Sequence, residues 1–273
     1  MFKNFFSALN FLKKYGIKNF LYKVVNYLFK IPDPISLKKK KILDYLISKS
    51  DSKVLYGPFK NMLLMKNARW AKFDLIPQLL GTYEENIVNY IINKREINKE
   101  LFVEIGAGDG YFVVGFSFSE IFKNVYAFEI SDEGRKIIKN NAIRNNCIDK
   151  IEIFKEANYT SLLEIERKFS GGIILIDIEG AEYDLLNEKI LSLLRKFHLI
   201  IEMHPFLITN PKEKHNKLMS RVKKYFLVDK SKRENYNPSK FNELSKFTED
   251  EQLLALSEGR SEKTEWLLLS PKN

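Results

Sequence analysis

Two short polar stretches, each at the end of an apolar run, contain the residues best suited to chemistry. Asp177 and Glu179 follow one such run, and Glu202 and His204 end another. A strand that is buried on both faces of a sheet is apolar throughout, and a buried charge is costly unless it is paired or lies in a site. These four side chains are therefore predicted to lie in a crevice at the carboxyl ends of neighbouring strands.

The imidazole of His204 is the one group among them that ordinarily titrates near neutral pH. It is the candidate general base, oriented by Asp177 or Glu179, and these three residues form the predicted catalytic set. In a second hypothesis Asp177, Glu202 and His204 bind a divalent cation that acidifies a hydroxyl group. The same groups can also form a metal-free network, and Glu179 and Glu182 flank a predicted helix start, where the macrodipole alone favours acids.

A glycine-rich turn lies within the stretch LFVEIGAGDGY, residues 101–111. Glycines at 106, 108 and 110 let backbone N–H groups approach a ligand with no Cβ in the way, and the next helix points its N-terminus at that ligand. Glu104 precedes the first glycine by two residues. A dinucleotide-binding fingerprint needs its third glycine at position 111, which is Tyr111. The turn is therefore predicted to bind a different nucleotide-like cofactor.

Glu129 is predicted to end the second strand, 23 positions after Gly106. In a doubly wound sheet, ligands bind beyond the carboxyl ends of the strands, where an acid can accept both hydroxyls of a ribose. The alternative is that Glu129 caps the following helix. Because Ser131 can itself cap that helix, the ribose role is favoured.

These motifs resemble those of class I S-adenosylmethionine-dependent methyltransferases, and in particular the FkbM-like family. The resemblance rests on "FVEIGAGDGYF", "VYAFE", "IDIEGAE" and "IIEMH" and covers roughly residues 99–206. Upstream, "YGPFK" and "LLGTYE" are similar to segments of poorly characterised relatives. Asp109 departs from the commoner form of the glycine motif in that family, which has Asn at this position.

The resemblance implies S-adenosylmethionine as cofactor and O-methylation of a sugar or another small hydroxylated acceptor in glycan or secondary-metabolite biosynthesis. It also places adenine near the segment after the third strand, residues 156–158. The predicted cofactor-binding residues are Glu104, Gly106, Ala107, Gly108, Asp109, Gly110, Tyr111, Glu129, Ile130, Glu156, Ala157, Asn158 and Asp177. The acceptor itself is not specified by these motifs.

Apolar runs and helical patterns alternate from residue 100 onward, which is typical of an α/β fold with a doubly wound, mainly parallel sheet. The resemblance makes this the seven-stranded, Rossmann-like class I methyltransferase fold. The predicted strands cover residues 101–105, 124–130, 150–156, 172–178, 198–204, 226–230 and 265–270. The predicted helices cover residues 111–122, 132–146, 159–169, 181–196 and 211–224.

Three regions are expected along the chain. Residues 1–52 form a basic amphipathic helical extension, residues 53–98 a linker or cap region, and residues 99–273 the methyltransferase domain with an acceptor-side insertion at 232–262. Within the cap region, a turn at Gly57-Pro58 predicts a short strand or hairpin. Thr82 is predicted to cap a helix that runs to about Lys94.

The positive charge is concentrated near the N-terminus. Residues 1–60 hold 13 Lys or Arg and 3 Asp or Glu, whereas the rest of the chain holds 32 of each sign and is neutral. A basic extension allows an RNA methyltransferase as the alternative function. Nucleic acid is nevertheless the less favoured partner, because the predicted catalytic region is neutral and the extension contains lysine rather than arginine.

Phe2, Phe5, Leu9 and Leu12 recur at helical spacing in residues 1–30, with lysines off that face. Such a face can contact an anionic membrane, pack on the main domain or mediate homo-oligomerisation, and packing on protein is favoured.

The composition is typical of a globular protein, and the single cysteine, Cys147, excludes an internal disulfide. No signal peptide or membrane span is predicted. The expected location is the cytoplasm, with peripheral contact at the inner membrane as the alternative, and richness in Lys, Asn and Ile fits an AT-rich bacterial genome.

Overall fold

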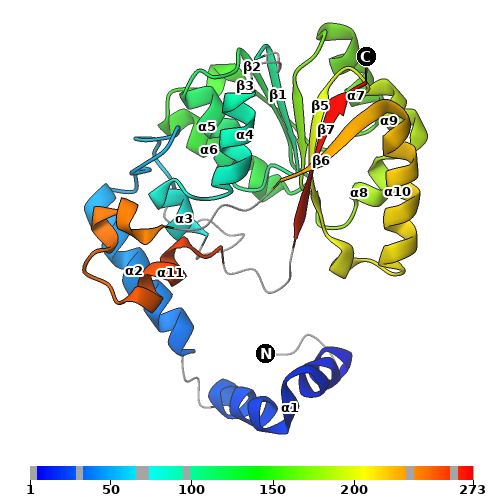
Figure 1. The fold of residues 1–273 in the computed structure, drawn as a ribbon. Coiled ribbons are helices and arrows are strands. Elements are labelled where there is room, and N and C mark those ends of the chain that lie inside the picture. The colour runs from blue at the N-terminus through cyan, green and yellow to red at the C-terminus, as the bar shows by residue number, and fades with distance from the viewer. Residues whose placement is uncertain are drawn as a thin grey trace.

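A seven-stranded sheet forms the centre of the protein in the computed structural model (Figure 1). The structure describes residues 5–28, 33–65, 74–94, 99–231, 237–258 and 264–272. The strand order is β3-β2-β1-β4-β5-β7-β6. All neighbouring strands pair in parallel except β7, which is antiparallel to both β5 and β6. The predicted fold class, α/β with a doubly wound and mainly parallel seven-stranded sheet, is confirmed.

The strands lie where the apolar runs predict them, with slightly shorter bounds. The central strand β1 is buried along its whole length because helices cover both faces of the sheet. The strands are β1 Leu101–Ile105, β2 Asn124–Phe128, β3 Ile151–Phe154, β4 Ile173–Ile176, β5 His198–Met203, β6 Phe226–Lys230 and β7 Glu265–Pro271.

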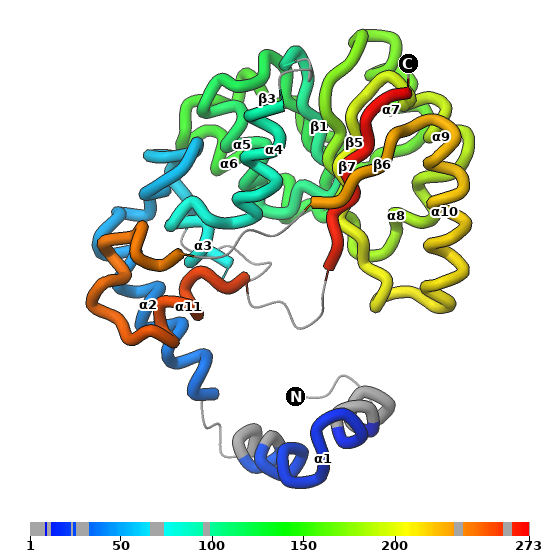
Figure 2. The backbone as a smooth tube through the Cα atoms, viewed as in Figure 1, coloured from blue at the N-terminus to red at the C-terminus, as the bar shows by residue number. Residues whose placement is uncertain are grey.

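Two hydrophobic clusters lie on opposite faces of this sheet (Figures 1 and 2). One contains side chains of α2 to α6 and α11, and the other contains side chains of α7, α9 and α10. The helices are α1 Phe5–Leu28, α2 Pro34–Ser50, α3 Leu75–Leu80, α4 Glu85–Asn93, α5 Tyr111–Phe118, α6 Asp132–Arg144, α7 Tyr159–Lys168, α8 Glu182–Leu185, α9 Glu188–Leu193, α10 Pro211–Tyr225 and α11 Glu249–Leu256.

Two helix predictions were wrong in detail. The helix expected over residues 181–196 is divided into α8 and α9, because Asn187 is extended and its side chain accepts a hydrogen bond from Ile190 N, which caps a new helix. The cap predicted at Thr82 is not formed. The hydroxyl of Thr82 instead donates to the carbonyl of Pro77, and α4 begins after Glu84, whose φ is 45°.

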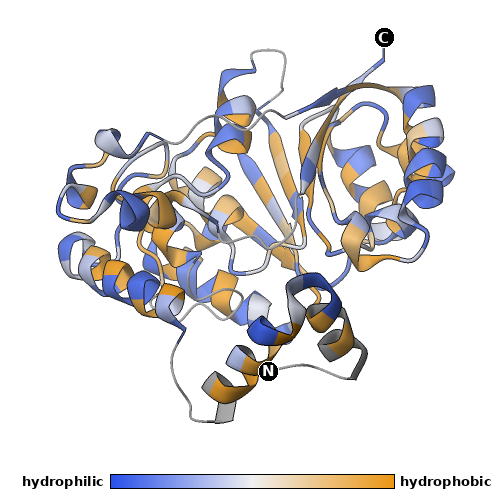
Figure 3. Ribbon diagram, turned by 60° about the horizontal axis from the view of Figure 1, so that its bottom comes forward, coloured by the Kyte–Doolittle hydropathy of each residue, from blue (hydrophilic) through white to orange (hydrophobic). Residues whose placement is uncertain are grey.

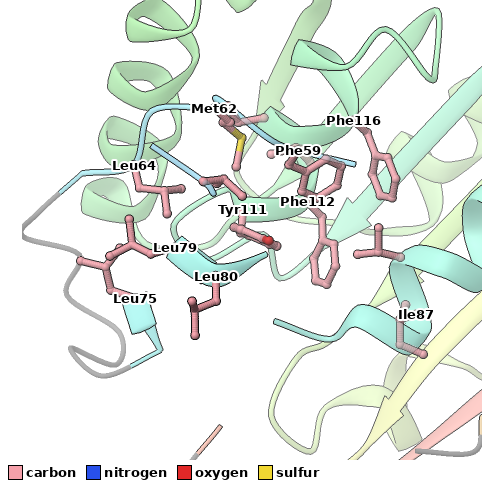
Figure 4. Packing of buried hydrophobic residues seen from close by; sticks show 14 of the residues in the cluster. Phe59, Met62, Leu64, Leu75, Leu79, Leu80, Ile87, Tyr111, Phe112 and Phe116 are labelled. Atoms are coloured by element: carbon pink, nitrogen blue, oxygen red, sulfur yellow. The ribbon is translucent and has the colours of Figure 1, made fainter. Parts of the chain in front are cut away.

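The upstream segments around Gly57 and Gly81 pack together and cover one end of α5. Residues 53–63 form the expected turn, closed by an antiparallel bridge between Lys53 and Leu63. A Cβ on Gly81 would lie 2.1 Å from the carbonyl oxygen of Tyr56, so the two segments touch through glycine backbone. Figure 4 shows this region packed around Tyr111 at the start of α5.

The described part of the predicted insertion, residues 237–258, lies against α2 rather than standing alone (Figures 1 and 2). The phenol of Tyr56 donates to Glu243 at 2.6 Å. Two lysines of α2 also reach this segment, at 2.7 Å for Lys38 with Asp250 and 2.9 Å for Lys41 with Glu251. The segment is therefore anchored to the helical extension.

The helix α1 is kinked at Gly16, where φ is 79°. It lies beyond the end of the sheet at which the parallel strands finish (Figures 1 and 3). Ile17, Leu21 and Val25 are exposed on this helix, with exposed fractions of 68, 54 and 44%. These side chains do not pack on the main domain, and packing of the helix on a second subunit stays a prediction. Among the described residues, no helix has the length and apolar character needed to span a bilayer.

Candidate active site

The glycine turn between β1 and α5 forms one wall of the site. Gly106, Gly108 and Gly110 all have positive φ, at 90°, 54° and 84°. The backbone N–H groups of Gly106 and Ala107 donate to the carbonyl of Phe128, at 2.8 and 3.0 Å. A Cβ on Gly106 would lie only 1.8 Å from the carbonyl oxygen of Asp177. Only glycine therefore allows the turn to lie directly against the end of β4.

Glu104 is a buried carboxyl beneath this turn. Within the described residues, it accepts a hydrogen bond from Val113 N at 3.2 Å. Burial raises the pKa of Glu104 well above its ordinary value, and the nearby charges of Asp177 and Asp109 raise it further. The group lies in a position that favours a positively charged ligand.

Glu129 follows β2, as predicted, and its carboxylate supports the turn. Its two oxygens accept hydrogen bonds from Gly108 N at 2.9 Å and Ser131 N at 2.8 Å. The hydroxyl of Ser131 caps α6 by accepting from Gly134 N at 3.3 Å, so Glu129 is not the side-chain cap of this helix. An ionised carboxylate has about four acceptor positions. Two of them remain for the hydroxyls of a ligand.

Four other predicted cofactor residues lie near the carboxyl ends of β2 and β3. The apolar side chain of Ile130 is 71% exposed beside Glu129, where a flat apolar ring could cover it. Glu156 is exposed, and Ala157 is partly buried against the hydrophobic cluster. The side chain of Asn158 forms a capping box with Ser161 at the start of α7. Helix capping therefore accounts for Asn158.

The side chains of Asp109 and Tyr111 face the upstream segments. Asp109 accepts hydrogen bonds from Tyr111 N at 3.2 Å and from the amide of Gln78 at 3.3 Å. The ring of Tyr111 packs edge-on against Phe59 and Tyr83, with centroids 5.4 and 5.3 Å apart (Figure 4). Burial raises the pKa of Asp109 and of Tyr111. These two side chains therefore attach the turn to the cap region.

His204 and the acids predicted around it form the second wall of the site. Nε2 of His204 lies 3.6 Å from Oδ1 of Asp177, 3.8 Å from Oε2 of Glu179 and 3.9 Å from Oε2 of Glu202. His204 and Glu202 are buried, whereas the side chains of Asp177 and Glu179 are 30 and 75% exposed. The predicted grouping of strand-end residues is thus present, and it is open to solvent on the side of Glu179.

Glu182 is the member of this cluster that the sequence did not assign to the site. Its Oε1 lies 2.8 Å from Nδ1 of His204 and also accepts from Gly180 N at 3.1 Å. The side chain is fully buried. Its spacing from Asp177 across a glycine-containing turn was the available signal, but a helix-start acid explained that spacing equally well.

The pKa of His204 reflects opposing effects. Burial acts to lower it, but the hydrogen bond to Glu182 and the charges of Asp177, Glu182 and Glu179 raise it, and the net shift is upward. Ligand atoms of Asp177, Glu179 and His204 all lie within 4.8 Å of one another, which is close enough for all three to bind one metal ion. Glu202 of the predicted metal set lies nearby but outside this group.

No protein-family model matches the sequence, and no curated protein matches it. The structure is similar to that of a tRNA methyltransferase from Aquifex aeolicus, with 15% identity, a TM-score of 0.42 and 69% of each chain covered. TrmK of M. capricolum, solved with S-adenosyl-homocysteine, has 15% identity and a TM-score of 0.41, with 68% of each chain covered. A ribosomal protein L11 methylase from Lactobacillus delbrueckii subsp. bulgaricus has 17% identity and a TM-score of 0.42, with 71% of this chain and 80% of that chain covered. Similarities at this level concern the fold alone.

Proposed function

We propose that the protein is an S-adenosylmethionine-dependent methyltransferase that methylates a hydroxyl group of a sugar or another small hydroxylated acceptor. The observation that supports this most directly is the position of His204. Its Nδ1 is held by Glu182, and its Nε2 faces Asp177 at the end of β4. The backbone of Asp177 in turn lies against Gly106 of the glycine turn. A proton-accepting group and a cofactor cradle therefore adjoin each other.

The residues around the glycine turn fit the proposed cofactor. S-adenosylmethionine carries an ammonium group and a sulfonium, and Glu104 is a buried acid whose pKa is raised and which such charges would stabilise as a carboxylate. The free acceptor positions of Glu129 suit ribose hydroxyls, and exposed Ile130 suits an adenine face. When bound, the cofactor supplies an electrophilic methyl group and leaves as a neutral thioether.

The protein's own contribution to the reaction is to orient the acceptor and remove its proton. A hydroxyl must lose its proton as its oxygen forms the new bond to carbon. Without a bound ion, Nε2 of His204 is the atom placed to receive that proton, because Nδ1 is engaged with Glu182. We therefore assign to Glu182 the orienting role that the sequence suggested for Asp177 or Glu179, and we retain those two at the acceptor side.

RNA is the alternative acceptor, and the basic extension is the feature that favours it. The excess of 10 positive charges lies within residues 1–60, and the remainder of the chain is neutral. RNA binding through lysines would weaken steeply with salt. We favour a small acceptor because no excess positive charge belongs to the region that contains His204.

We also propose that α1 contacts an anionic membrane surface. Its sequence contains Lys13, Lys14, Lys18 and Lys23 and no acidic residue. Exposed apolar side chains accompany them. Figure 3 colours both hydrophilic and hydrophobic residues along this helix. Basic amphipathic helices bind anionic bilayers through both features. Because α1 lies beyond the carboxyl ends of the parallel strands, such contact would bring the site close to the membrane.

The decisive experiment is methyl transfer with purified protein and S-adenosylmethionine carrying a labelled methyl group. Nucleotide-sugars, glycan extracts and total RNA serve as separate acceptor pools. Label in a hydroxylated small acceptor is expected, and His204→Ala should abolish it while cofactor binding by calorimetry persists. His215→Ala is the matched control, since His215 lies on α10 outside the cluster. Label in RNA alone would replace the acceptor assignment, and absence of cofactor binding would refute the proposal.

A further inference from the structure

Trp266 carries a buried hydrogen-bond donor at the edge of the sheet where the site lies. The residue is the second of β7 and is only 6% exposed. Within the part of the chain that the structure describes, its indole Nε1–H has no hydrogen-bond partner. An unpaired buried donor costs free energy, so folded proteins rarely keep one without a structural or functional reason. The N–H of Trp266 is therefore a candidate contact for a bound molecule.

The strand register places Trp266 beside the polar strand ends of the site. Trp266 pairs with Glu202 across the antiparallel strands β5 and β7, and opposite residues of such a pair point to the same face of the sheet. The carboxylate of Glu202 lies 3.9 Å from Nε2 of His204. The last parallel pair of β4 and β5 lies one residue before Asp177 and Glu202, so these two are level with each other. Asp177, Glu202 and Trp266 thus follow one another across the sheet.

The indole lies on the same face of the sheet as Glu104 beneath the glycine turn. Trp266 packs in the same hydrophobic cluster as Phe102. Residues two apart on a strand share a face, so Glu104 lies on that side as well and accepts from Val113 N of α5 there. Strands β4 and β5 separate β1 from β7, which is about 14 Å at about 4.8 Å per strand. That separation leaves room for an acceptor beside a cofactor.

We propose that Nε1–H of Trp266 donates a hydrogen bond to an uncharged oxygen of the acceptor, such as a sugar hydroxyl or ring oxygen. This inference rests on the proposed function and adds a residue that decides which acceptor binds. An indole N–H can only donate, so its partner must be an atom with a lone pair. Asp177 and Glu202 lie beside it, and their like charge would oppose a phosphate or carboxylate oxygen. A neutral hydroxylated ligand fits both conditions.

The absence of a partner in the free protein makes this donor selective. A hydrogen bond to an acceptor oxygen would satisfy a group that otherwise stays unpaired, and such a bond is stronger in surroundings of low dielectric constant. An analogue without that oxygen would leave the N–H buried and unpaired, so the site would discriminate against it. Nε1 is shielded from solvent. An oxygen that reaches it must displace the atoms that cover it, and binding therefore includes a local rearrangement.

The test follows the indole N–H signals of ¹⁵N-labelled full-length protein by nuclear magnetic resonance, with S-adenosyl-homocysteine present. The chain has two tryptophans, and Trp70→Phe assigns the signal of Trp266. D-glucose at millimolar concentration is the neutral probe, and sodium phosphate is the anionic probe. D-glucose should move the signal of Trp266 downfield and saturably, because hydrogen bonding deshields the proton. Phosphate should leave the signal in place.

The kinetics of methyl transfer give a second readout. Trp266→Phe keeps an aromatic ring but removes the donor. It should raise the KM for the acceptor that takes label by about threefold to tenfold, with kcat and S-adenosylmethionine affinity unchanged. Tyr183→Phe is the matched control, because its hydroxyl is also buried without a hydrogen-bond partner among the described residues but packs in the cluster on the opposite face. It should leave that KM unchanged.

A Trp266 signal that does not respond to D-glucose, or that responds equally to phosphate, would overturn the assigned contact. An unchanged KM in Trp266→Phe would do the same while leaving the proposed methyltransferase intact. Conversely, a response of Trp266 to D-glucose in a protein that binds no S-adenosylmethionine would support the hydroxyl contact and refute the proposed function.

Discussion

Nδ1 of His204 lies 2.8 Å from Oε1 of Glu182, and this contact joins the segments that follow two neighbouring strands, β5 and β4. His204 directly follows β5, whereas Glu182 begins α8 after β4. The same oxygen accepts from Gly180 N, so the turn after β4 and the imidazole share one anchor. The orientation of Nε2 toward Asp177 and Glu179 is therefore set by a fully buried side chain that would not contact an acceptor.

Glu182→Gln should reduce methyl transfer by about tenfold to a hundredfold, because outer carboxylates of this type have effects of that size. The substitution keeps the shape of the side chain but removes the charge that fixes the tautomer of His204. S-adenosylmethionine affinity should remain unchanged, since the hydrogen bonds of Glu182 go to Ile178 N, Gly180 N and His204 and not to the glycine turn. Initial rates and calorimetric titration measure the two quantities.

Glu188→Gln is the control for that prediction, because Glu188 pairs with Lys224 on the surface at 3.0 Å. It should leave the rate unchanged. A Glu182→Gln variant with full activity would show that Glu182 serves folding alone.

Glu104→Gln should make the unfolding free energy of the cofactor-free protein less sensitive to rising pH. The folded-state pKa of Glu104 is raised above its ordinary value of 4.5, so the folded protein retains a proton that the unfolded chain has lost. That difference stabilises the folded state fully below about pH 4.5 and is lost as the pH rises through the folded-state pKa. Glutamine mimics the protonated form, and its contribution does not change with pH.

Urea denaturation from pH 4 to pH 8 measures this effect as the difference in unfolding free energy between Glu104→Gln and the unchanged protein. The difference should grow in favour of the variant as pH rises, while affinity for S-adenosylmethionine falls. A constant difference across this range would contradict the upward pKa shift.

The strands and the strand-end residues were the predictable part of this structure. Uninterrupted apolar runs are required for strands covered on both faces, so β1, β4 and β5 were found from local sequence alone. Because parallel strands end at one edge, Asp177 and His204 were expected to meet there, and Nε2 lies 3.6 Å from Oδ1.

Contacts that depend on distant parts of the chain were not predictable in the same way. Glu182 was explained by the helix dipole, and nothing local indicated that its carboxylate faces the end of β5. Tyr111 was assigned to the cofactor from its place in the motif, but its ring packs on Phe59 and Tyr83 of the upstream segments. Residues 237–258 contact α2 across about 200 positions, which no local pattern encodes.

Gly81→Ala should destabilise the protein by about 3 kcal/mol, from a backbone clash added to left-handed strain. The new Cβ would lie 2.1 Å from the carbonyl oxygen of Tyr56, and backbone cannot move aside easily. Gly57→Ala is a close control, because both glycines have φ of 76° but the nearest atom to a Cβ on Gly57 is 3.1 Å away. It should cost about 1 kcal/mol. Urea denaturation measures the loss of unfolding free energy in each variant. Equal losses for Gly81→Ala and Gly57→Ala would show that left-handed backbone strain alone, and not the clash with Tyr56, decides the effect.

Removal of residues 1–32 should abolish sedimentation with vesicles that contain anionic phospholipid, while leaving S-adenosylmethionine binding intact. The full-length protein should bind such vesicles and not neutral ones, because each lysine near an anionic surface contributes about 1 kcal/mol. A variant with Lys13, Lys14 and Lys18 changed to Gln separates charge from apolar contact and should bind more weakly. In contrast, Ile17→Ser and Leu21→Ser should weaken binding even at low salt, since both side chains are exposed.

Vesicle binding that survives truncation would place the membrane contact elsewhere. Salt-sensitive binding to RNA, lost on the same truncation, would instead assign this helix to the alternative acceptor.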